Sequence, residues 1–193
     1  MNYEEITKKM VTRIGGADIS TIMGTNPYET LDDLYLKLIG VKKIEPNKYM
    51  EIGLLFEETI AKHYQQQYGG ELVKADKKAH PVYPFMVGSA DYFIDDDILE
   101  IKTTSKRLSK TLNDNYYYQV MHYLDVYNKY KGIVYIFSFT DLEFKRFEVL
   151  KNDLIIKEKN DKVLEFVEKY FSPQKELSDY NKIVNDNNIE IPF

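Results

Sequence analysis

The chain has 193 residues, of which 44% are hydrophobic and 14% aromatic, and a formal net charge of -5 at pH 7. This composition predicts one folded domain over residues 1–193 and excludes a disordered chain. The absence of cysteine excludes disulfides, thiolate-bound zinc, iron–sulfur clusters and a thiol nucleophile. No apolar run approaches the roughly 20 residues that span a bilayer, and the acidic N-terminus lacks a signal-peptide pattern, so we expect a cytoplasmic protein with no membrane partner.

The acidic net charge by itself argues weakly against a nucleic-acid partner, because non-specific DNA binding depends on Lys and Arg. The charges are unevenly distributed, however. Lys102, Lys106, Arg107 and Lys110 follow one another closely, whereas the acids of residues 95–97 precede them. A locally positive groove on an acidic protein is compatible with DNA.

Helices dominate the first 70 residues, and the part before about residue 45 forms an N-terminal helical region. The patterns predict helices over 3–12, 18–23, 30–38 and 48–68. Asp18 and Thr30 are the expected N-caps of the second and third helices. In the long helix, the apolar residues expected near one face are Met50, Leu54, Ile60, Ala61 and Tyr64.

After Gly69-Gly70 the pattern changes to strands. Strands are predicted over 71–75, 79–83, 85–94, 98–104, 132–139 and 143–150, with helices over 115–131 and 152–170. Residues 85–94 and 98–104 would form one hairpin, and a polar tail would follow the last helix within 152–193. This order predicts an α/β (α+β) fold with a mixed central β-sheet flanked by helices.

The segments Gly88-Ser89-Ala90-Asp91 and Leu99-Glu100-Ile101-Lys102 are the most informative. Because side chains alternate across a strand, Glu100 and Lys102 must point to the same face. Asp91 lies a short hairpin away. Two carboxylates that converge beside a lysine form a site for a hard cation next to a positive charge.

This set of side chains suits metal-assisted hydrolysis of a phosphodiester. Asp91 and Glu100 would supply oxygen ligands to one or two Mg²⁺ ions, and the carbonyl of Ile101 could be another oxygen ligand. Lys102 would orient the attacking water or stabilise charge in the transition state. The alternative is a surface strand with an ordinary Glu-Lys pair, which the apolar neighbours and the spacing from Asp91 disfavour.

Two neighbouring helices contribute further candidates. Glu57 lies one turn after Gly53, although read locally it is a solvated helix residue. Gln119 lies four residues before Tyr123, hence on the same helix face, where it could bond to a phosphate or the catalytic water. Tyr117 belongs to a tyrosine cluster that could stack on bases. The three histidines, His63, His80 and His122, lack metal-ligand spacing, which argues against a zinc hydrolase.

These motifs resemble a known group of enzymes. The elements Gly88-x-x-Asp91, Glu100-Ile101-Lys102 and Gln119-x-x-x-Tyr123 resemble the PD-(D/E)XK nuclease superfamily and its RecB-like branch. Residues 13–19, 26–28 and 53–58 are similar to the YqaJ-type phage recombinases of the lambda exonuclease group. The resemblance extends over residues 13 to 150, and it implies a restriction-endonuclease-like core.

The resemblance also implies roles for individual residues. Asp91 and Glu100 match the metal-binding acids, and Lys102 matches the catalytic lysine. Glu57 matches an additional helix acid that supports the metal site, and Gln119 matches a glutamine near the active site. Outside the active centre, the residues expected to contact DNA are Arg13, at a 5′ phosphate, together with Lys106, Arg107 and Tyr117. Ala90 and Tyr92 depart from the family pattern, which often has Pro and Gly there, and Tyr92 would narrow the approach to the metals.

By the same resemblance, the activity expected is a Mg²⁺-dependent exonuclease on the ends of double-stranded DNA, with Mn²⁺ as a substitute in vitro. Relatives degrade the 5′-ended strand and leave a 3′ overhang for a single-strand annealing protein. They also form a homotrimeric ring. The resemblance implies a phage or prophage origin and a bacterial host cytoplasm.

Two other functions remain as alternatives. One is a restriction-like or RecB-like DNA endonuclease, although no base-reading element is recognisable and a Cas4-like version would need the missing cysteines. The other is an inactive DNA-end-binding protein on a nuclease fold. The presence of Asp91, Glu100 and Lys102 argues against inactivity, because decay normally removes one of these groups.

Overall fold

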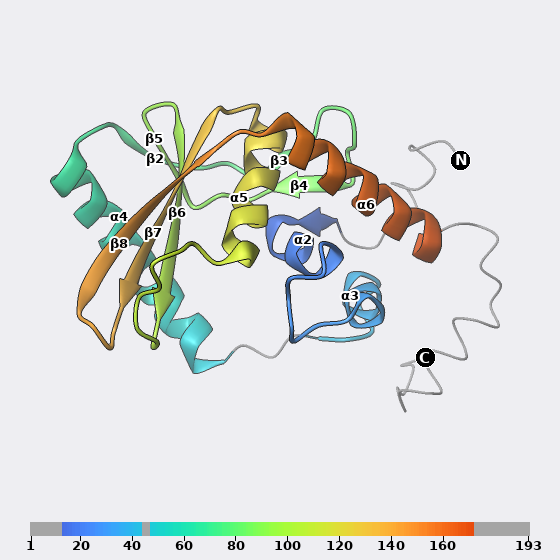
Figure 1. Cartoon of the computed structure of the whole chain (residues 1–193), viewed down its shortest axis with the longest axis horizontal. Coiled ribbons are helices and arrows are strands. Elements are labelled where there is room, and N and C mark those ends of the chain that lie inside the picture. The colour runs from blue at the N-terminus through green and yellow to red at the C-terminus, as the bar shows by residue number, and fades with distance from the viewer. Residues whose placement is uncertain (1–12, 44–46, 172–193) are drawn as a thin grey trace.

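The computed structural model describes residues 13–43 and 47–171, and the helix expected over 3–12 and the polar tail lie outside these ranges. Its main feature is a five-stranded sheet with the order β2-β5-β6-β7-β8 (Figure 1). The strands are β2 (Leu72–Lys74), β5 (Tyr92–Ile94), β6 (Asp97–Thr104), β7 (Lys131–Ser138) and β8 (Glu143–Leu150). Strands β6 and β7 are parallel and the other neighbours antiparallel, which confirms the expected mixed sheet.

Helices cover both faces of this sheet, as Figure 1 shows. Helix α4 (Lys48–Tyr68) lies on one face, and α5 (Asp114–Tyr127) lies on the other. Helix α5 connects the parallel strands β6 and β7, which need a crossover connection of this kind. The fold is therefore a mixed α/β arrangement with the sheet in the middle.

Strand β6 divides its side chains between the two layers. Ile98 packs in the core cluster built around α5, whereas Leu99 and Ile101 pack in the cluster that contains the buried residues of α4. Because strand side chains alternate, Glu100 and Lys102 share the α5 side with Ile98. The strand thus aims its acid and its lysine at one helix.

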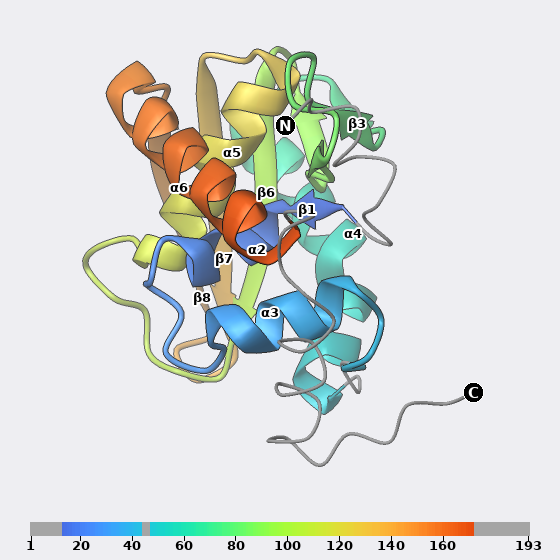
Figure 2. The same ribbon diagram turned by 90° about the vertical axis from the view of Figure 1, so that its right-hand side faces the viewer.

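A smaller sheet and three helices complete the described structure. The strands β1 (Ile14–Gly15), β4 (Met86–Gly88) and β3 (Lys78–Ala79) form a sheet in the order β1-β4-β3. The helices are α2 (Gly16–Ile22), α3 (Leu31–Leu38) and α6 (Asp153–Phe171). Helix α6 lies along α2 and α5 (Figure 2). None of the helices in the described residues is both long and apolar enough to cross a membrane.

Some predicted helix boundaries are confirmed. Helix α3 has Thr30 as its N-cap, and the Thr30 side chain accepts a hydrogen bond from the backbone N–H of Asp33. Helix α4 covers the predicted range and ends at Gly69, whose φ of 77° is a left-handed conformation that favours glycine. Capping chemistry was therefore sufficient to locate both helices.

The second helix begins earlier than predicted, and Asp18 is not its N-cap. Helix α2 begins at Gly16, and the Asp18 side chain accepts a hydrogen bond of 2.8 Å from the backbone N–H of Gly15. Gly16 lies inside the helix for a packing reason. A Cβ at this position would lie 2.5 Å from the ring of Tyr123, so glycine allows α2 to approach α5 closely.

The single strand predicted over 85–94 is wrong. The chain forms β4 in the small sheet, leaves it after Gly88 and then forms β5 in the large sheet. A Cβ at Gly88 would lie 2.5 Å from the Tyr127 ring, so α5 packs directly against this segment. The change of sheet places Asp91 at the start of β5, next to β6.

Two further strand and helix boundaries differ. The strand predicted over 79–83 is wrong, because only Lys78–Ala79 pair and the ring nitrogen Nδ1 of His80 accepts the backbone N–H groups of Val82 and Tyr83. The helix predicted over 115–131 ends at Tyr127, because Asn128 adopts a left-handed conformation with φ of 54°.

The apolar face predicted for α4 is only half correct. Ile60, Ala61 and Tyr64 are buried against the sheet. Met50 and Leu54 are exposed, at 47% and 74% of their surface. The first half of α4 therefore extends beyond the sheet core, and periodicity alone does not reveal where the core stops.

Candidate active site

The two predicted acids meet where β5 begins beside β6. Tyr92 pairs with Leu99 in the antiparallel ladder, and Asp91 precedes Tyr92. The Oδ2 atom of Asp91 accepts the backbone N–H of Ile101 at 2.8 Å. This bond fixes the Asp91 carboxylate next to the strand that carries Glu100 and Lys102.

Glu100 is the centre of the polar contacts in the candidate active site. It is 1% exposed, and its Oε1 atom accepts hydrogen bonds from Lys102 Nζ at 2.6 Å and from Gln119 Nε2 at 2.9 Å. Gln119 Nε2 also donates to the hydroxyl of Tyr123 at 2.9 Å. The structure thus brings together Asp91, Glu100, Lys102 and Gln119, from β5, β6 and α5.

Burial and neighbouring charges shift the pKa values of three groups in the candidate active site. Burial, followed by the nearby charge of Glu100, raises the pKa of Asp91 to about 7. Burial acts to lower the pKa of Lys102, but the charges of Glu100 and Asp91 outweigh it, and the pKa is raised. Burial and the Glu100 charge also raise the pKa of Tyr123, which therefore keeps its proton at neutral pH.

The residues present fit a hard divalent cation. Glu100 Oε2 is buried without a hydrogen-bond partner, although most buried polar atoms have one. The raised pKa of Asp91 reflects burial and then the neighbouring charge of Glu100, and a bound cation would favour the ionised carboxylate against both. Asp91 and Glu100 offer oxygen ligands, which Mg²⁺ prefers. Within residues 13–43 and 47–171 no group of three or more His, Asp or Glu could hold a metal, so water and substrate oxygens would complete the coordination.

Ile101 contributes its backbone to the candidate active site. Its side chain is buried in the cluster on the α4 side, and its N–H holds Asp91. The role of the Ile101 carbonyl as a metal ligand stays a prediction.

Glu57 lies on the α4 side of the sheet and has a different partner. Its Oε1 atom is 2.5 Å from the ammonium of Lys74 on β2. The Glu57 charge nevertheless contributes to raising the pKa of Asp91, so the two carboxylates lie within electrostatic range of each other. Glu58, the next residue, is exposed and pairs with Lys62.

The predicted DNA-binding residues Lys106 and Arg107 lie on an exposed loop after β6. With Thr104 and Tyr116 they line a cavity of about 500 Å³. The Lys102 ammonium is 5.5 Å from the centre of the Tyr116 ring, which links this cavity to the candidate active site. The cavity therefore adjoins the predicted catalytic lysine.

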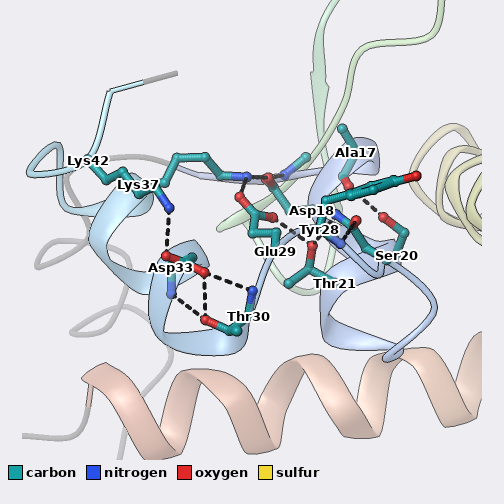
Figure 3. Close-up of polar contacts among 12 residues, drawn as sticks. Ala17, Asp18, Ser20, Thr21, Tyr28, Glu29, Thr30, Asp33, Lys37 and Lys42 are labelled. Atoms are coloured by element: carbon teal, nitrogen blue, oxygen red, sulfur yellow. Dashed lines mark hydrogen bonds and ion pairs between the residues drawn. The ribbon is translucent and has the colours of Figure 1, made fainter. Parts of the chain in front are cut away.

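Thr25, Pro27 and Tyr28, from the loop between α2 and α3, also line this cavity. Figure 3 shows the polar contacts among α2, α3 and the loop that joins them. Lys37 of α3 is 2.9 Å from Asp18 and 2.7 Å from Glu29, and Glu29 accepts the Thr21 hydroxyl at 2.6 Å. These contacts thus hold in place the loop that contributes Thr25 and Tyr28 to the cavity.

Two other predicted DNA contacts have structural partners. The Arg13 guanidinium donates to the carbonyl of Pro84 at 2.8 Å. Tyr117 packs edge-on against Tyr118, with ring centres 5.5 Å apart, and borders the α5 core. In the described residues neither side chain has a hydrogen bond or ion pair with Asp91 or Glu100, and their DNA contacts stay predictions.

A second charged cluster, which sequence reasoning missed, lies between α5 and α6. Lys159 is fully buried and pairs with Asp125 at 2.8 Å. His80 Nε2 lies 3.3 Å from Asp125 on its other oxygen. Because His122 Nε2 donates to the carbonyl of Val87, its Nδ1 faces Lys159 as an acceptor at 3.4 Å. We call these residues the buried charge cluster. Single histidines and a lysine in helical patterns carry no signal of such pairing.

Known proteins share both sequence and fold with this chain. A family model described as the YqaJ-like viral recombinase domain matches residues 3–130. The uncharacterized protein YqaJ of Bacillus subtilis (strain 168) is 34% identical over an alignment of 125 positions, which covers 58% of this chain and 39% of that protein. The chain therefore spans about two fifths of the length of that curated relative.

Solved structures with the same fold include exonucleases. The alkaline exonuclease LHK-Exo of Laribacter hongkongensis has a TM-score of 0.67 at 15% identity, over 96% of both chains. Its complex with dAMP gives 0.68 at 12%, over 91% of this chain and 93% of that chain. A phage related exonuclease from Haemophilus somnus 129PT gives 0.65 at 14%, over 95% and 99%. At these identities the likeness establishes the fold.

The sequence match and the fold agree. The family model covers about two thirds of the chain, and its range includes Glu57, Asp91, Glu100, Lys102 and Gln119. The chain therefore belongs to the YqaJ-like viral recombinase domain family.

Proposed function

We propose that this protein is a metal-dependent deoxyribonuclease of the PD-(D/E)XK type, which acts as an exonuclease on the ends of double-stranded DNA. The observation that carries the proposal is the Oε2 atom of Glu100, which is buried beside Asp91 without a hydrogen-bond partner, while the other oxygen of Glu100 pairs with the Lys102 ammonium. A buried carboxylate pair next to an ammonium matches what phosphodiester hydrolysis needs. Membership of a recombinase family and the fold shared with exonucleases support the same conclusion.

In this proposal, Asp91 and Glu100 would hold Mg²⁺, with the Ile101 carbonyl as a further predicted ligand. Glu57 would join them only on leaving its pair with Lys74. When bound, Mg²⁺ would supply Lewis acidity to the phosphate and to the attacking water. Mn²⁺ would substitute, because it accepts the same oxygen ligands.

The protein's own groups perform the remaining tasks. Lys102 keeps its proton because its pKa is raised, so its ammonium stabilises negative charge on the phosphate oxygens. Gln119 donates to Glu100 and fixes that carboxylate in one orientation. Lys106 and Arg107, exposed at the adjoining cavity, attract the DNA backbone. The chain as a whole has a net charge of -5, but these two residues make the surface at the cavity locally basic.

The finer features of the activity rest on the family resemblance. We propose 5′ to 3′ polarity, a 3′ overhang as product, a single-strand annealing protein as partner and a homotrimeric ring around DNA. A ring would keep the enzyme on its substrate by topology, which suits a protein whose net charge is -5. Light scattering on the purified protein would measure the trimer, and strand-specific labels on a duplex would report the polarity.

The experiment that tests the function compares linear and closed-circular duplex DNA, each with Mg²⁺ or with EDTA. We expect degradation of the linear form with Mg²⁺ and none with EDTA. Cutting of the circle would instead establish an endonuclease. DNA binding without cleavage of either form would establish an inactive end-binding protein and overturn the proposal.

A further inference from the structure

Lys74, which the sequence analysis did not single out, lies next to the acids of the candidate active site. It is opposite Tyr92 in the antiparallel pairing of β2 with β5. The following residue, Ala75, donates its N–H to the carbonyl of Asp91 at 3.3 Å. The sheet therefore fixes Lys74 beside the segment that brings Asp91 to β6.

The ammonium of Lys74 has two contacts. It is 2.5 Å from Glu57 Oε1, and it lies over the ring of Tyr92, 4.3 Å from the ring centre. Burial acts to lower the pKa of Lys74, but the hydrogen bond with Glu57 and the negative charges around the ammonium together outweigh it, and the pKa is raised. Lys74 is therefore a cation at neutral pH, supported by a carboxylate and an aromatic face.

Tyr92 was expected to narrow the approach to the metals. That expectation stays a prediction, and the structure shows that the Tyr92 ring, which is 7% exposed, is also the platform beneath Lys74. The same ring, Glu57 and Lys74 line a cavity of about 530 Å³. This space allows the Lys74 side chain, 59% exposed, to leave Glu57 without rearrangement of the core.

The electrostatic surroundings connect this pair to the candidate active site. Both Glu57 and Lys74 interact electrostatically with Asp91. A divalent cation at Asp91 and Glu100 would attract the Glu57 carboxylate and repel the Lys74 ammonium. The cation and Lys74 would therefore compete for the same carboxylate.

We propose that Lys74 is a positioning residue that competes with the divalent cation for Glu57, so that metal binding and opening of the Lys74–Glu57 pair are coupled. The inference rests on the proposed nuclease function, because it assumes a metal at the acid pair. Lys74 holds Glu57 in place and also limits metal affinity. Its removal makes Glu57 available to the metal.

The test is a titration of the full chain with Mn²⁺ alone, in which electron paramagnetic resonance counts the free ion and no DNA is present. We expect Lys74→Met to bind Mn²⁺ about tenfold more tightly than the wild type. Lys62→Met is the matched control, because Lys62 is similarly exposed and pairs with the adjacent Glu58. We expect this control to leave the affinity within about twofold of the wild type.

A double-mutant cycle separates competition from a general field effect. In a Glu57→Gln background, Lys74→Met should no longer tighten Mn²⁺ binding, because the shared carboxylate is gone. An equal gain in both backgrounds would overturn the proposal, as would unchanged or weaker binding by Lys74→Met. Lys74→Gln, a polar replacement, serves as the second variant, and thermal melting in EDTA verifies that each variant is folded.

The two proposals fail in different ways. A wild-type protein that binds no Mn²⁺ would overturn both the metal site and the role of Lys74. A wild type that binds Mn²⁺ and loses it on Glu100→Gln, with no response to Lys74→Met, would overturn only the role of Lys74.

Discussion

Asp125, on α5, and Asp91, just before β5, are two acids with opposite electrostatic surroundings. Burial disfavours the charged form of both. Around Asp125, hydrogen bonds from His80, Lys159 and Asn160 outweigh burial and hold the pKa of this carboxyl well below its usual range. Around Asp91, burial and the charge of Glu100 act together and raise the pKa to about 7.

The difference separates a structural charge cluster from a binding site. Asp125 has its positive partner, Lys159, inside the protein. Glu100 has Lys102 on one oxygen, but its other oxygen is buried without a partner, and Asp91 lies beside it. Two buried carboxylates whose negative charge is only partly neutralised destabilise the protein alone, and a bound cation removes this destabilisation.

The largest expected effect is on catalysis at Lys102. We expect Lys102→Ala to reduce degradation of linear duplex DNA by about 10²-fold or more, because it removes a cation placed at the developing charge. The melting temperature should fall, because the variant leaves the buried Glu100 without its counter-charge, so cleavage is compared at a temperature at which the variant is folded. Cleavage near the wild-type rate in the folded variant would contradict the assignment.

The next effect compares the two clusters directly. We expect Asp125→Asn to lower the free energy of unfolding by about 3 kcal/mol, because it leaves Lys159 buried without its counter-charge. Glu100→Gln should change stability by less than about 1 kcal/mol, since it also removes repulsion with Asp91, but should abolish Mg²⁺-dependent cleavage. Urea unfolding and a nuclease assay on both variants give the four values.

A double replacement serves as the control for this prediction. Asp125→Leu combined with Lys159→Met removes both charges from the buried charge cluster, and we expect it to be closer to the wild type in stability than Asp125→Asn. If the double variant is the less stable of the two, an unpaired Lys159 is not the reason for the loss.

The pH dependence of stability should also differ between the clusters. Burial lowers the pKa of His122 to about 3, from an ordinary value of 6.5. Between these pH values the unfolded chain binds one more proton, so this group destabilises the fold by about 1.4 kcal/mol per unit as the pH falls. The raised pKa of Asp91 acts in the opposite sense, because its contribution to stability decreases as the pH rises from 3.8 to about 7.

Urea unfolding from pH 4 to 8 measures both slopes. Relative to the wild type, His122→Gln should lose stability less steeply on acidification, and Asp91→Asn should lose it more steeply. Parallel curves for the wild type and a variant would mean that the replaced group has the same pKa in the folded and unfolded chains.

The smallest expected effect concerns Arg13. By the family resemblance, Arg13→Ala should weaken the preference for 5′-phosphorylated ends by several-fold, because one charged contact is removed. Competition between phosphorylated and unphosphorylated duplexes provides the measurement. An equal loss on both kinds of end would remove this role from Arg13.

Local patterns in the sequence were sufficient to predict the elements that carry the candidate active site. Strand alternation places Glu100 and Lys102 on one face, and helical spacing places Gln119 and Tyr123 together. Both inferences depend on residues within four positions of each other. The short distance from Asp91 to Glu100 across a hairpin similarly limits where the second acid can lie.

Contacts between distant segments were not predictable in this way. No local pattern indicates that a tyrosine of α5 packs against Gly16 and another against Gly88, which leaves no room for a Cβ at either position. The pairing of Lys74 with Glu57 joins residues 17 positions apart, on a strand and a helix. The partners of Lys159 depend on how α6 lies against α5, which no local pattern specifies.

Anomalous scattering from a crystal grown with Mn²⁺ tests the metal site at Asp91 and Glu100 most directly. We expect a peak about 2.0–2.2 Å from Glu100 Oε2 and from an Asp91 oxygen, and no peak there in Glu100→Gln. A protein that cleaves DNA while this position stays without a peak would contradict the account.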